Sequence, residues 1–342
     1  MTPVIAEITD LGETEPVGEI TRIQQKRLML FGGRSHPELF EAVAAQLGTE
    51  LTPMSARDFA NGEIFVRFHE SVRGCDAFVM QSHCADINTW IMEQLIMVDA
   101  LKRASAERIT VVTPFYGYAR QDKKHRGREP ITARLMADLF KAAGADRLMT
   151  VDLHTSQIQG FFDGPVDHLF ALPLLADYLG ERLDRDRITV VSPDAGRVRV
   201  AERWTDVLGS PLAIIHKRRD PDTPNEVTVL EVVGDVKDRV CVVVDDMIDT
   251  GGTIDKAADL LFAQGASDVV VAATHGVLSD PATERLKNSR ISEVVVTNTL
   301  PIPSDRHFDK LTVLSIAPLI AQAVHEVFTD GSVTSLFGSA HG

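Results

Sequence analysis

The chain has 342 residues, a usual length for two globular domains, and its 44% hydrophobic residues can build two sizeable cores. The net charge of −14 argues against a general nucleic-acid or membrane surface, because both partners are anionic. The three cysteines have no metal-binding spacing and predict a reduced, cytoplasmic protein. No apolar run approaches the length of a membrane span.

The first 25 residues carry five acidic side chains and lack the basic and apolar regions of a signal peptide. We expect residues 1–25 to form a disordered acidic extension.

After this extension, short β-rich runs alternate with helical patterns. The predicted strands are residues 27–31, 77–81, 109–113, 148–151, 188–192, 240–244, 268–273 and 293–297. Helices are predicted between them, including residues 36–48, 88–105 and 131–144. Alternation of helices with strongly apolar strands predicts an α/β fold with central parallel sheets covered on both faces.

Two strand ends repeat one pattern, TVVTP at residues 110–114 and TVVSP at residues 189–193, which favours two doubly wound domains of similar plan. We place an N-terminal domain at residues 26–165, a C-terminal domain at residues 166–325 and a tail at residues 326–342. Ligands of such sheets bind at the carboxyl ends of the strands. Most candidate motifs lie there.

The first motif is RQDKKHRGRE at residues 120–129, with five basic residues against two acidic ones. Arg120 and its neighbours would suit a polyphosphate, and a solvated loop is an equally good interpretation. A second basic cluster, Lys217-Arg218-Arg219, follows the strand-like LAIIH. On a mobile loop it could close over a reacting phosphate, or it could be an ordinary surface turn.

His154 follows a strand, and Asp194 lies in PDAG. One histidine and one carboxylate can hold Mg²⁺ when phosphates and water supply the other ligands. Because histidine is an unusual ligand for a hard cation, the residues alone favour a structural role for His154.

Residues 240–253 read VCVVVDDMIDTGGT and are the most informative stretch. A buried strand ends in two acids, Asp245 and Asp246, and a glycine-containing turn then leads into a helix. Backbone N–H groups and the helix N-terminus favour a phosphate in this turn. Carboxylates accept hydrogen bonds from vicinal hydroxyls. The parts suit a sugar phosphate better than the alternative of a capped strand-turn-helix corner, and no Walker-type loop or GxGxxG after a strand is present.

Longer motifs carry a resemblance. FANGE, ESVRGCD, PFYGYARQDKK, REPITARL, DLHTSQIQGFFD, VSPDAG, IIHKRR, DDMIDTGGT and THGVLSDPA occur in order over residues 27–337. Together they resemble the ribose-phosphate pyrophosphokinase family. The resemblance implies two phosphoribosyltransferase-type α/β domains, ATP binding in the first and ribose 5-phosphate binding in the second. It also implies that ATP and ribose 5-phosphate give 5-phosphoribosyl 1-diphosphate (PRPP) and AMP.

The resemblance also assigns roles to residues. Lys217 and Arg219 would be catalytic, and His154 and Asp194 would bind Mg²⁺, which replaces the structural interpretation of His154. The ATP-binding residues would be Phe59, Asn61, Gly62, Glu63, Arg120 and Gln121, the first four acting across a subunit boundary. Ribose 5-phosphate would contact Arg219, Asp245, Asp249, Thr250, Gly251, Gly252 and Thr253.

The family resemblance further implies a homohexamer activated by phosphate and inhibited by ADP, with Ser71, Arg73 and Ser332 in the regulatory site. One departure is Arg197, where the family often has a second glycine after PDAG. Two alternatives stay open: a non-catalytic regulator related to the family, and a phosphoribosyltransferase that consumes PRPP. The intact Asn61, Arg120 and Lys217 argue against the first, and the two-domain length argues against the second.

Overall fold

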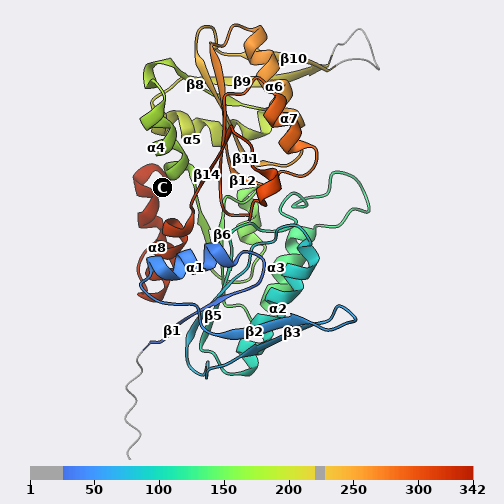
Figure 1. Cartoon of the computed structure of the whole chain (residues 1–342), viewed down its shortest axis with the longest axis vertical. Helices are drawn as coiled ribbons and strands as arrows, with labels where there is room; N and C mark the ends of the chain where they lie inside the picture. The colour runs from blue at the N-terminus through green and yellow to red at the C-terminus, as the bar shows by residue number, and fades with distance from the viewer. Residues whose placement is uncertain (1–25, 220–227, 342) are drawn as a thin grey trace, which may run out of the picture.

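The computed structural model describes residues 26–219 and 228–341, so the predicted extension lies outside it. Two α/β lobes are stacked along the long axis of the molecule (Figure 1). Each is built around its own central sheet, as the alternating pattern predicts. Within the described residues, no helix is long and apolar enough to cross a membrane.

The first sheet is parallel throughout, with strand order β1-β4-β5-β6-β7. Its strands are β1 (Leu28–Gly32), β4 (Asp76–Met80), β5 (Arg108–Thr113), β6 (Arg147–Val151) and β7 (Val166–Leu169). Its helices are α1 (Pro37–Gln46), α2 (Ile87–Arg103) and α3 (Thr132–Ala143). All five residues of β4 are buried, because helices cover both faces of a parallel sheet.

The second sheet has the order β10-β9-β8-β11-β12-β13-β14, and only β10 is antiparallel. Its strands are β8 (Ile188–Ser192), β9 (Leu212–Arg219), β10 (Thr228–Val233), β11 (Val240–Ile248), β12 (Asp268–Gly276), β13 (Glu293–Thr297) and β14 (Leu311–Leu314). Its helices are α4 (Leu172–Arg182), α5 (Val198–Leu208), α6 (Gly252–Ala263) and α7 (Ala282–Asn288). Short 3-10 turns cover Ser156–Gly160, Arg185–Arg187, Ala195–Arg197, Ser304–Arg306 and Val333–His341.

The predicted eight strands are all present, and two have the predicted bounds, β8 and β13. The hairpin β2 (Met54–Asp58) and β3 (Ile64–Phe68) was not predicted. It projects from the side of the first lobe (Figure 1), and no residue of either strand is fully buried. A half-exposed hairpin lacks the continuous apolar run by which the central strands are recognised.

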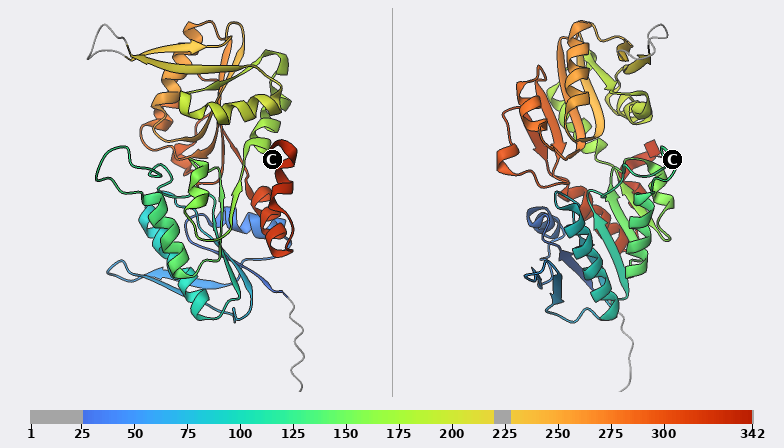
Figure 2. Two further views of the ribbon diagram at one scale, coloured as in Figure 1. Left: turned by 180° about the vertical axis from the view of Figure 1, so that it is seen from behind. Right: turned by 90° about the vertical axis from the view of Figure 1, so that its right-hand side faces the viewer.

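The chain divides between the lobes differently from the expected boundary at residues 165 and 166. Strand β7 begins at Val166 and pairs with β6, so the first sheet ends at Leu169. The last helix, α8 (Ala317–Phe328), returns to the first lobe and lies beside α1 (Figure 2). Buried residues of α1, α8, α4 and α5 form one apolar cluster that runs through both lobes.

Lys217, Arg218 and Arg219 belong to a strand, which corrects the predicted loop. Strand β9 continues through Arg219, where its backbone is paired with Thr228 of β10. Antiparallel pairing with β10 supplies the hydrogen-bond partners that extend β9 beyond LAIIH. The side chains of these three residues lie outside the described part.

A polar junction joins the two lobes. Ser82, after β4, donates a hydrogen bond to the carbonyl of Thr299, and Thr274 donates to Asp152 Oδ2 at 2.6 Å. His275 lies with Nε2 3.1 Å from the carbonyl of Asp152. Buried side-chain bonds to backbone have narrow geometry, so the junction fixes the carboxyl ends of the two sheets relative to each other.

Candidate active site

The loops after β5, β6, β8 and β11 meet between the lobes, so the predicted concentration of motifs at strand ends is confirmed. His154 follows β6 of the first sheet, whereas Arg197 follows β8 and Asp246 lies near the end of β11. These three side chains, which are distant in sequence, are in direct contact.

The acid pair lies within β11, because the strand continues to Ile248 beyond its apolar run. Asp245 and Asp246 have side chains only 18% and 6% exposed. Asp246 Oδ2 is 2.8 Å from His154 Nδ1, and its Oδ1 accepts from Arg197 Nη2 at 2.6 Å. Asp245 Oδ1 accepts the Asp246 backbone N–H at 2.9 Å and is 3.1 Å from Arg197 Nε.

The two carboxyls of the pair differ in acidity. Burial and the neighbouring charge of Asp246 raise the pKa of Asp245 well above its usual range. Burial acts in the same direction on Asp246, but the hydrogen bond from His154 and the charge of Arg197 outweigh it and lower its pKa to about 2. Asp246 therefore holds the negative charge, while Asp245 is the carboxyl that takes up a proton more easily.

His154 has the surroundings of a cation ligand. When its Nδ1 carries the proton and donates to Asp246, Nε2 keeps its lone pair. A carboxylate behind a histidine is a common arrangement in metal sites. Arg197 Nη2 is 2.6 Å from the same Nδ1, which can make only one of the two hydrogen bonds at a time.

Asp194 caps the short turn after β8. Its Oδ1 accepts the backbone N–H groups of Gly196 at 2.7 Å and Arg197 at 3.1 Å. One carboxylate oxygen is thus used for capping, and the other can serve a cation. Among the described residues, no three His, Cys, Asp or Glu side chains form a metal-binding group. The residues fit Mg²⁺ held mainly by phosphate and water, not by a protein cage.

The turn between β11 and α6 has the backbone expected of a phosphate site. Gly251 is the N-cap of α6 with φ of 72°, a left-handed conformation that glycine adopts without strain. The first N–H groups of α6 have no intrahelical acceptors, and they lie in the predicted phosphate turn at residues 249–253. Arg285 donates a hydrogen bond to the carbonyl of Thr250 and so stabilises the turn.

A cross-lobe ion pair joins two predicted binding loops. Arg120 Nη1, from the loop after β5, donates to Asp249 Oδ2 at 2.6 Å. Burial would raise the pKa of Asp249, but Ser279 and Arg120 lower it below its usual value. Arg120 and Gln121 also line a cleft of about 770 Å³ between the lobes, together with Phe115, Met247 and Leu300. Gln121 accepts a hydrogen bond from Thr132 at 2.6 Å.

The hairpin residues are not joined to this centre. Phe59, Asn61, Gly62 and Glu63 form the tip of β2–β3, where Phe59 is 43% exposed. Within the described residues, no hydrogen bond or ion pair links the tip to the acid pair. Asn61 Oδ1 instead accepts the backbone N–H of Glu63 at 3.2 Å, which closes the turn.

Of the expected regulatory residues, two lie in an exposed loop before β4 and the third lies in the tail. The carbonyl of Ser71 accepts from Arg27, and Arg73 is exposed. Ser332 contacts Thr334 at 2.8 Å. Arg108 binds both Asp76, at the start of β4, and Asp330 of the tail, and so brings the two segments together at the amino ends of β4 and β5.

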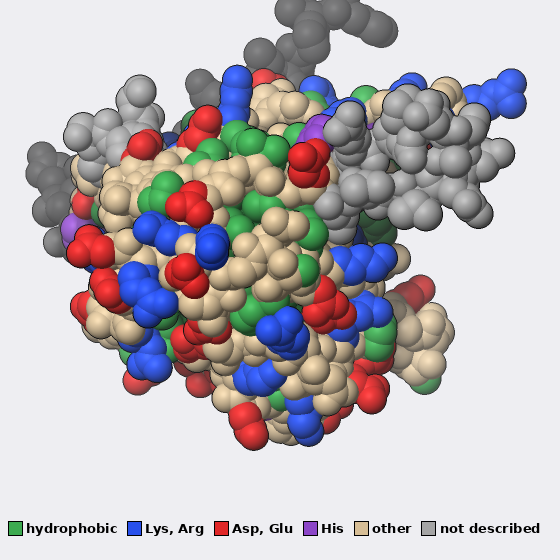
Figure 3. All heavy atoms as spheres, turned by 90° about the horizontal axis from the view of Figure 1, so that it is seen from above, with side chains coloured by type: hydrophobic (Ala, Val, Ile, Leu, Met, Phe, Trp, Pro, Cys, Tyr) green, Lys and Arg blue, Asp and Glu red, His purple; other side chains and the backbone are tan. Residues whose placement is uncertain are grey.

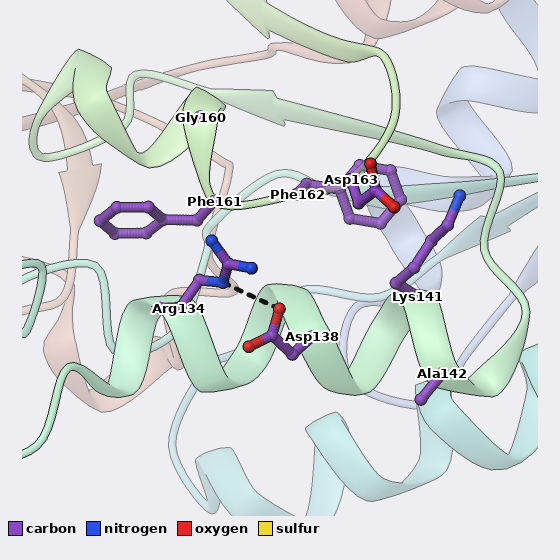
Figure 4. Close-up of a pocket in the computed structure, with 8 residues that line it drawn as sticks. All are labelled: Arg134, Asp138, Lys141, Ala142, Gly160, Phe161, Phe162 and Asp163. Atoms are coloured by element: carbon purple, nitrogen blue, oxygen red, sulfur yellow. Dashed lines mark hydrogen bonds and ion pairs between the residues drawn. The ribbon is translucent and has the colours of Figure 1, made fainter.

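A shallow pocket of about 520 Å³ lies on the first lobe, between α3 and the loop after β6 (Figure 4). Arg134 pairs with Asp138 along α3 at 2.8 Å, and Lys141 Nζ is 5.6 Å from the ring of Phe162. On α3, Leu135 and Leu139 are 53% and 40% exposed. This outer surface is a separate feature from the acid pair.

Three sets of contacts near the site were missed or left without a role in the sequence analysis. Asp246 was predicted, with Asp245, to accept hydrogen bonds from sugar hydroxyls, but its contacts with His154 and Arg197 were not predicted. Arg197 was noted as a departure without a role, and nothing local indicates that it reaches β11. The Arg34–Asp58 ion pair, 2.7 Å, joins the loop after β1 to the end of β2 next to the hairpin tip, and it had no local signal.

The fold and this centre define a two-domain α/β transferase built for phosphorylated substrates. A model of the N-terminal domain of ribose phosphate pyrophosphokinase matches residues 28–144, and a phosphoribosyl synthetase-associated domain matches residues 217–338. The chain belongs to the ribose-phosphate pyrophosphokinase family. The predicted family, fold class and enzymatic nature are confirmed.

Named relatives agree over nearly the whole chain. Ribose-phosphate pyrophosphokinase of Streptomyces coelicolor is 72% identical over 313 residues, which cover 92% of this chain and 97% of that protein. The Mycobacterium tuberculosis protein of the same name is 65% identical, with 92% and 96% covered. The crystal structure of phosphoribosylpyrophosphate synthetase from Mycobacterium smegmatis matches with a TM-score of 0.85 and 64% identity, over 90% of this chain and all of that one.

Proposed function

We propose that this chain transfers the β,γ-diphosphoryl group of ATP to the 1-hydroxyl of ribose 5-phosphate, giving PRPP and AMP. The observation that carries the proposal is the 2.6 Å contact between Arg120 and Asp249. It joins the loop assigned to ATP with the turn assigned to the sugar phosphate. Membership of the pyrophosphokinase family favours this reaction over a non-catalytic regulator.

The sugar would bind along the end of β11. Its 5-phosphate would accept N–H groups of the turn formed by Asp249, Thr250, Gly251, Gly252 and Thr253, and its hydroxyls would donate to Asp245. A helix N-terminus favours an anion by about 0.3–1 kcal/mol when exposed, so the converging N–H donors matter more than the dipole. This orientation would direct the 1-hydroxyl toward the cleft beside Arg120.

In the reaction, the oxygen of the 1-hydroxyl forms a bond to the β-phosphorus. The bond from that phosphorus to the α,β-bridging oxygen breaks, AMP leaves with the electron pair, and the hydroxyl proton passes to solvent. Lys217 and Arg219 would stabilise charge on the transferring group, from the end of β9. Positioning and charge stabilisation would supply most of the acceleration.

Mg²⁺ would be held by His154 and Asp194 together with the phosphates of ATP. Bound there, it would neutralise phosphate charge and polarise the β-phosphorus. The capping bonds of Asp194 and the carboxylate behind His154 fix both ligand-bearing loops.

The hairpin tip would bind the adenine of a neighbouring subunit, with Phe59 stacking on the base and Asn61 to Glu63 contacting its edge. A homohexamer is our proposal for the assembly. The exposed Leu135 and Leu139 support self-association, because their spacing of four residues places them on one face of α3, and the N-cap residue Ile131 is exposed as well. Met92 of α2 is also exposed.

We further propose phosphate activation and ADP inhibition through Ser71, Arg73 and Ser332, and activity in the cytoplasm. All three cysteines are unpaired, which suits a reducing compartment. No nucleic-acid or membrane partner is proposed. On the face over the second lobe, basic and acidic side chains are interspersed (Figure 3) and form no field of one sign.

The test incubates the purified protein with ATP, Mg²⁺, phosphate and ribose 5-phosphate and follows nucleotides by chromatography. AMP formed one-for-one with PRPP, only when ribose 5-phosphate is present, is the expected result. ADP instead would mean γ-phosphoryl transfer and a different kinase. Tight ATP binding without turnover would favour the non-catalytic regulator.

A further inference from the structure

Arg197 lies at the centre of the contacts between the two lobes. Its Nη2 donates to Asp246 Oδ1 at 2.6 Å, and its Nε is 3.1 Å from Asp245 Oδ1. Its Nη1 donates to the carbonyl of His154, on the other lobe, at 2.8 Å. One guanidinium therefore holds both members of the acid pair and the loop after β6. The planar fork of arginine suits this task, which a single ammonium could not perform.

The position of Arg197 is itself fixed. Its backbone N–H donates to Asp194 Oδ1 at 3.1 Å, and Ser192 Oγ donates to the Asp194 carbonyl at 2.7 Å. The side chain of Arg197 is only 12% exposed. Cap and burial together leave the guanidinium little freedom to move to solvent.

Arg197 is also the counter-charge of the acid pair. Among the side chains that the structure describes, it is the one Lys or Arg ion-paired with Asp245 or Asp246. Two adjacent, nearly buried carboxylates repel each other and also repel an incoming phosphate unless a cation balances them. A divalent ion could supply that balance only when it is bound, whereas Arg197 supplies it permanently.

Resting on the proposed binding of ribose 5-phosphate at β11, we propose that Arg197 is a positioning residue. It is a built-in counter-cation that fixes the acid pair against the His154 loop and forms the sugar site before a divalent ion binds. Wild-type protein then binds ribose 5-phosphate without Mg²⁺. A chain that lacks the guanidinium needs Mg²⁺ to bind the same sugar.

The experiment is calorimetric titration of ribose 5-phosphate into the full-length protein, first with EDTA and then with Mg²⁺. Arg197→Ala should raise the Kd in EDTA by about tenfold or more, since it removes a buried charged hydrogen-bond partner. Added Mg²⁺ should bring the Kd back toward the wild-type value. Arg199→Ala is the matched control, because Arg199 is exposed on the following helix, and its Kd should equal that of wild type.

Arg197→Lys keeps the charge without the fork, and serves if the alanine variant does not fold. We expect several-fold weaker binding in EDTA, relieved by Mg²⁺. Wild-type affinity of either Arg197 variant in EDTA would overturn the proposal, as would tighter binding or a loss that Mg²⁺ does not relieve. Wild-type protein that fails to bind ribose 5-phosphate under any condition would instead refute the proposed function.

Discussion

At the scale of single residues, the proposed chemistry depends most on Lys217, whose backbone lies in β9. Lys217→Ala should lower kcat about 100- to 1000-fold, because a cation directed at developing charge acts mainly in the transition state. The KM for ribose 5-phosphate should change little. Lys287→Ala, on the exposed side of α7, is the control. Steady-state kinetics decide the matter: a higher KM with normal kcat would contradict the transition-state role.

His83 provides a prediction on stability and pH. It is buried, accepts the N–H of Gly117 on Nδ1 and is 3.0 Å from Gln94 Oε1, and burial lowers its pKa to about 4. The unfolded chain protonates this histidine near pH 6.5, so it binds more protons than the native state at lower pH. Stability should therefore fall as the pH falls from about 6.5 to 4, by up to about 3 kcal/mol from this group.

The measurement is urea unfolding of wild type and His83→Gln at several values between pH 7 and pH 4. The variant should lose its part of the pH dependence, whatever its stability at neutral pH. His125→Gln, at an exposed loop position, should keep the wild-type dependence. An unchanged slope in His83→Gln would show that other buried groups, not His83, set the acid limit.

The residues of the site differ in how far the sequence predicts them. The turn at residues 249–253 is local, so its glycines and its following helix could be recognised from one stretch of chain. The contact of His154 with Asp246 and Arg197 joins three strands and two sheets. No local sequence pattern predicts this contact, because it depends on the strand order and on how the two lobes pack against each other.

At the scale of elements, the turn before α6 can be tested with matched glycines. Gly251 and Gly209 both have left-handed φ, 72° and 65°, and Gly209 ends α5 with open space around its Cα. Alanine at either position should cost about 1–2 kcal/mol from the backbone conformation. Only Gly251→Ala should also raise the KM for ribose 5-phosphate, by about 10- to 100-fold, because it displaces the N–H groups of the turn.

Thermal unfolding gives the stability cost of each glycine variant, and initial rates give its KM. Equal KM values in the two variants would contradict the proposal that the 5-phosphate of the sugar binds in this turn. Equal stability losses with different KM values would separate binding from folding.

Elements were predictable where burial was complete. Strands of both sheets, such as Ile188–Ser192, are buried along their whole length and therefore read as apolar runs. Strand β7 has the sequence VDHL, and because two of its four residues are polar it does not form an apolar run that would predict a strand. The extension of β11 through Asp245 and Asp246 comes from its continued pairing with β12, and Arg197 and His154 balance the acids from other elements.

At the scale of the whole molecule, the sequence could not predict which lobe the last helix packs against. The pattern of α8 indicates a helix with one apolar face, with Ile320 and Val324 buried, but it does not say which lobe that face covers. In the structure α8 packs beside α1, at the opposite end of the sequence. The chain of the second lobe is therefore joined to the first lobe both where it begins and where it ends. The ion pairs of Arg108 with Asp76 and with Asp330, just after α8, add to the contacts at the second of these places.

Among the residues that the structure describes, the hairpin tip makes no hydrogen bond or ion pair with the acid pair of its own chain. If Phe59 and Asn61 act on a neighbouring subunit, two inactive variants should restore each other's activity. One variant would be Phe59→Ala/Asn61→Ala and the other Lys217→Ala. After dissociation and reassembly of an equal mixture, about one site in four should combine an intact hairpin with an intact lysine.

The matched control is a mixture of Lys217→Ala with Gly251→Ala, two defects in the same lobe. Every hybrid site then carries one defect or the other, so activity should not exceed that of the separate variants. Mass measurement of the reassembled species verifies that hybrids have formed. If they form and the hairpin mixture stays inactive, the hairpin serves its own chain, and the hairpin would have to move within the first lobe to bring Phe59 to the cleft beside Arg120.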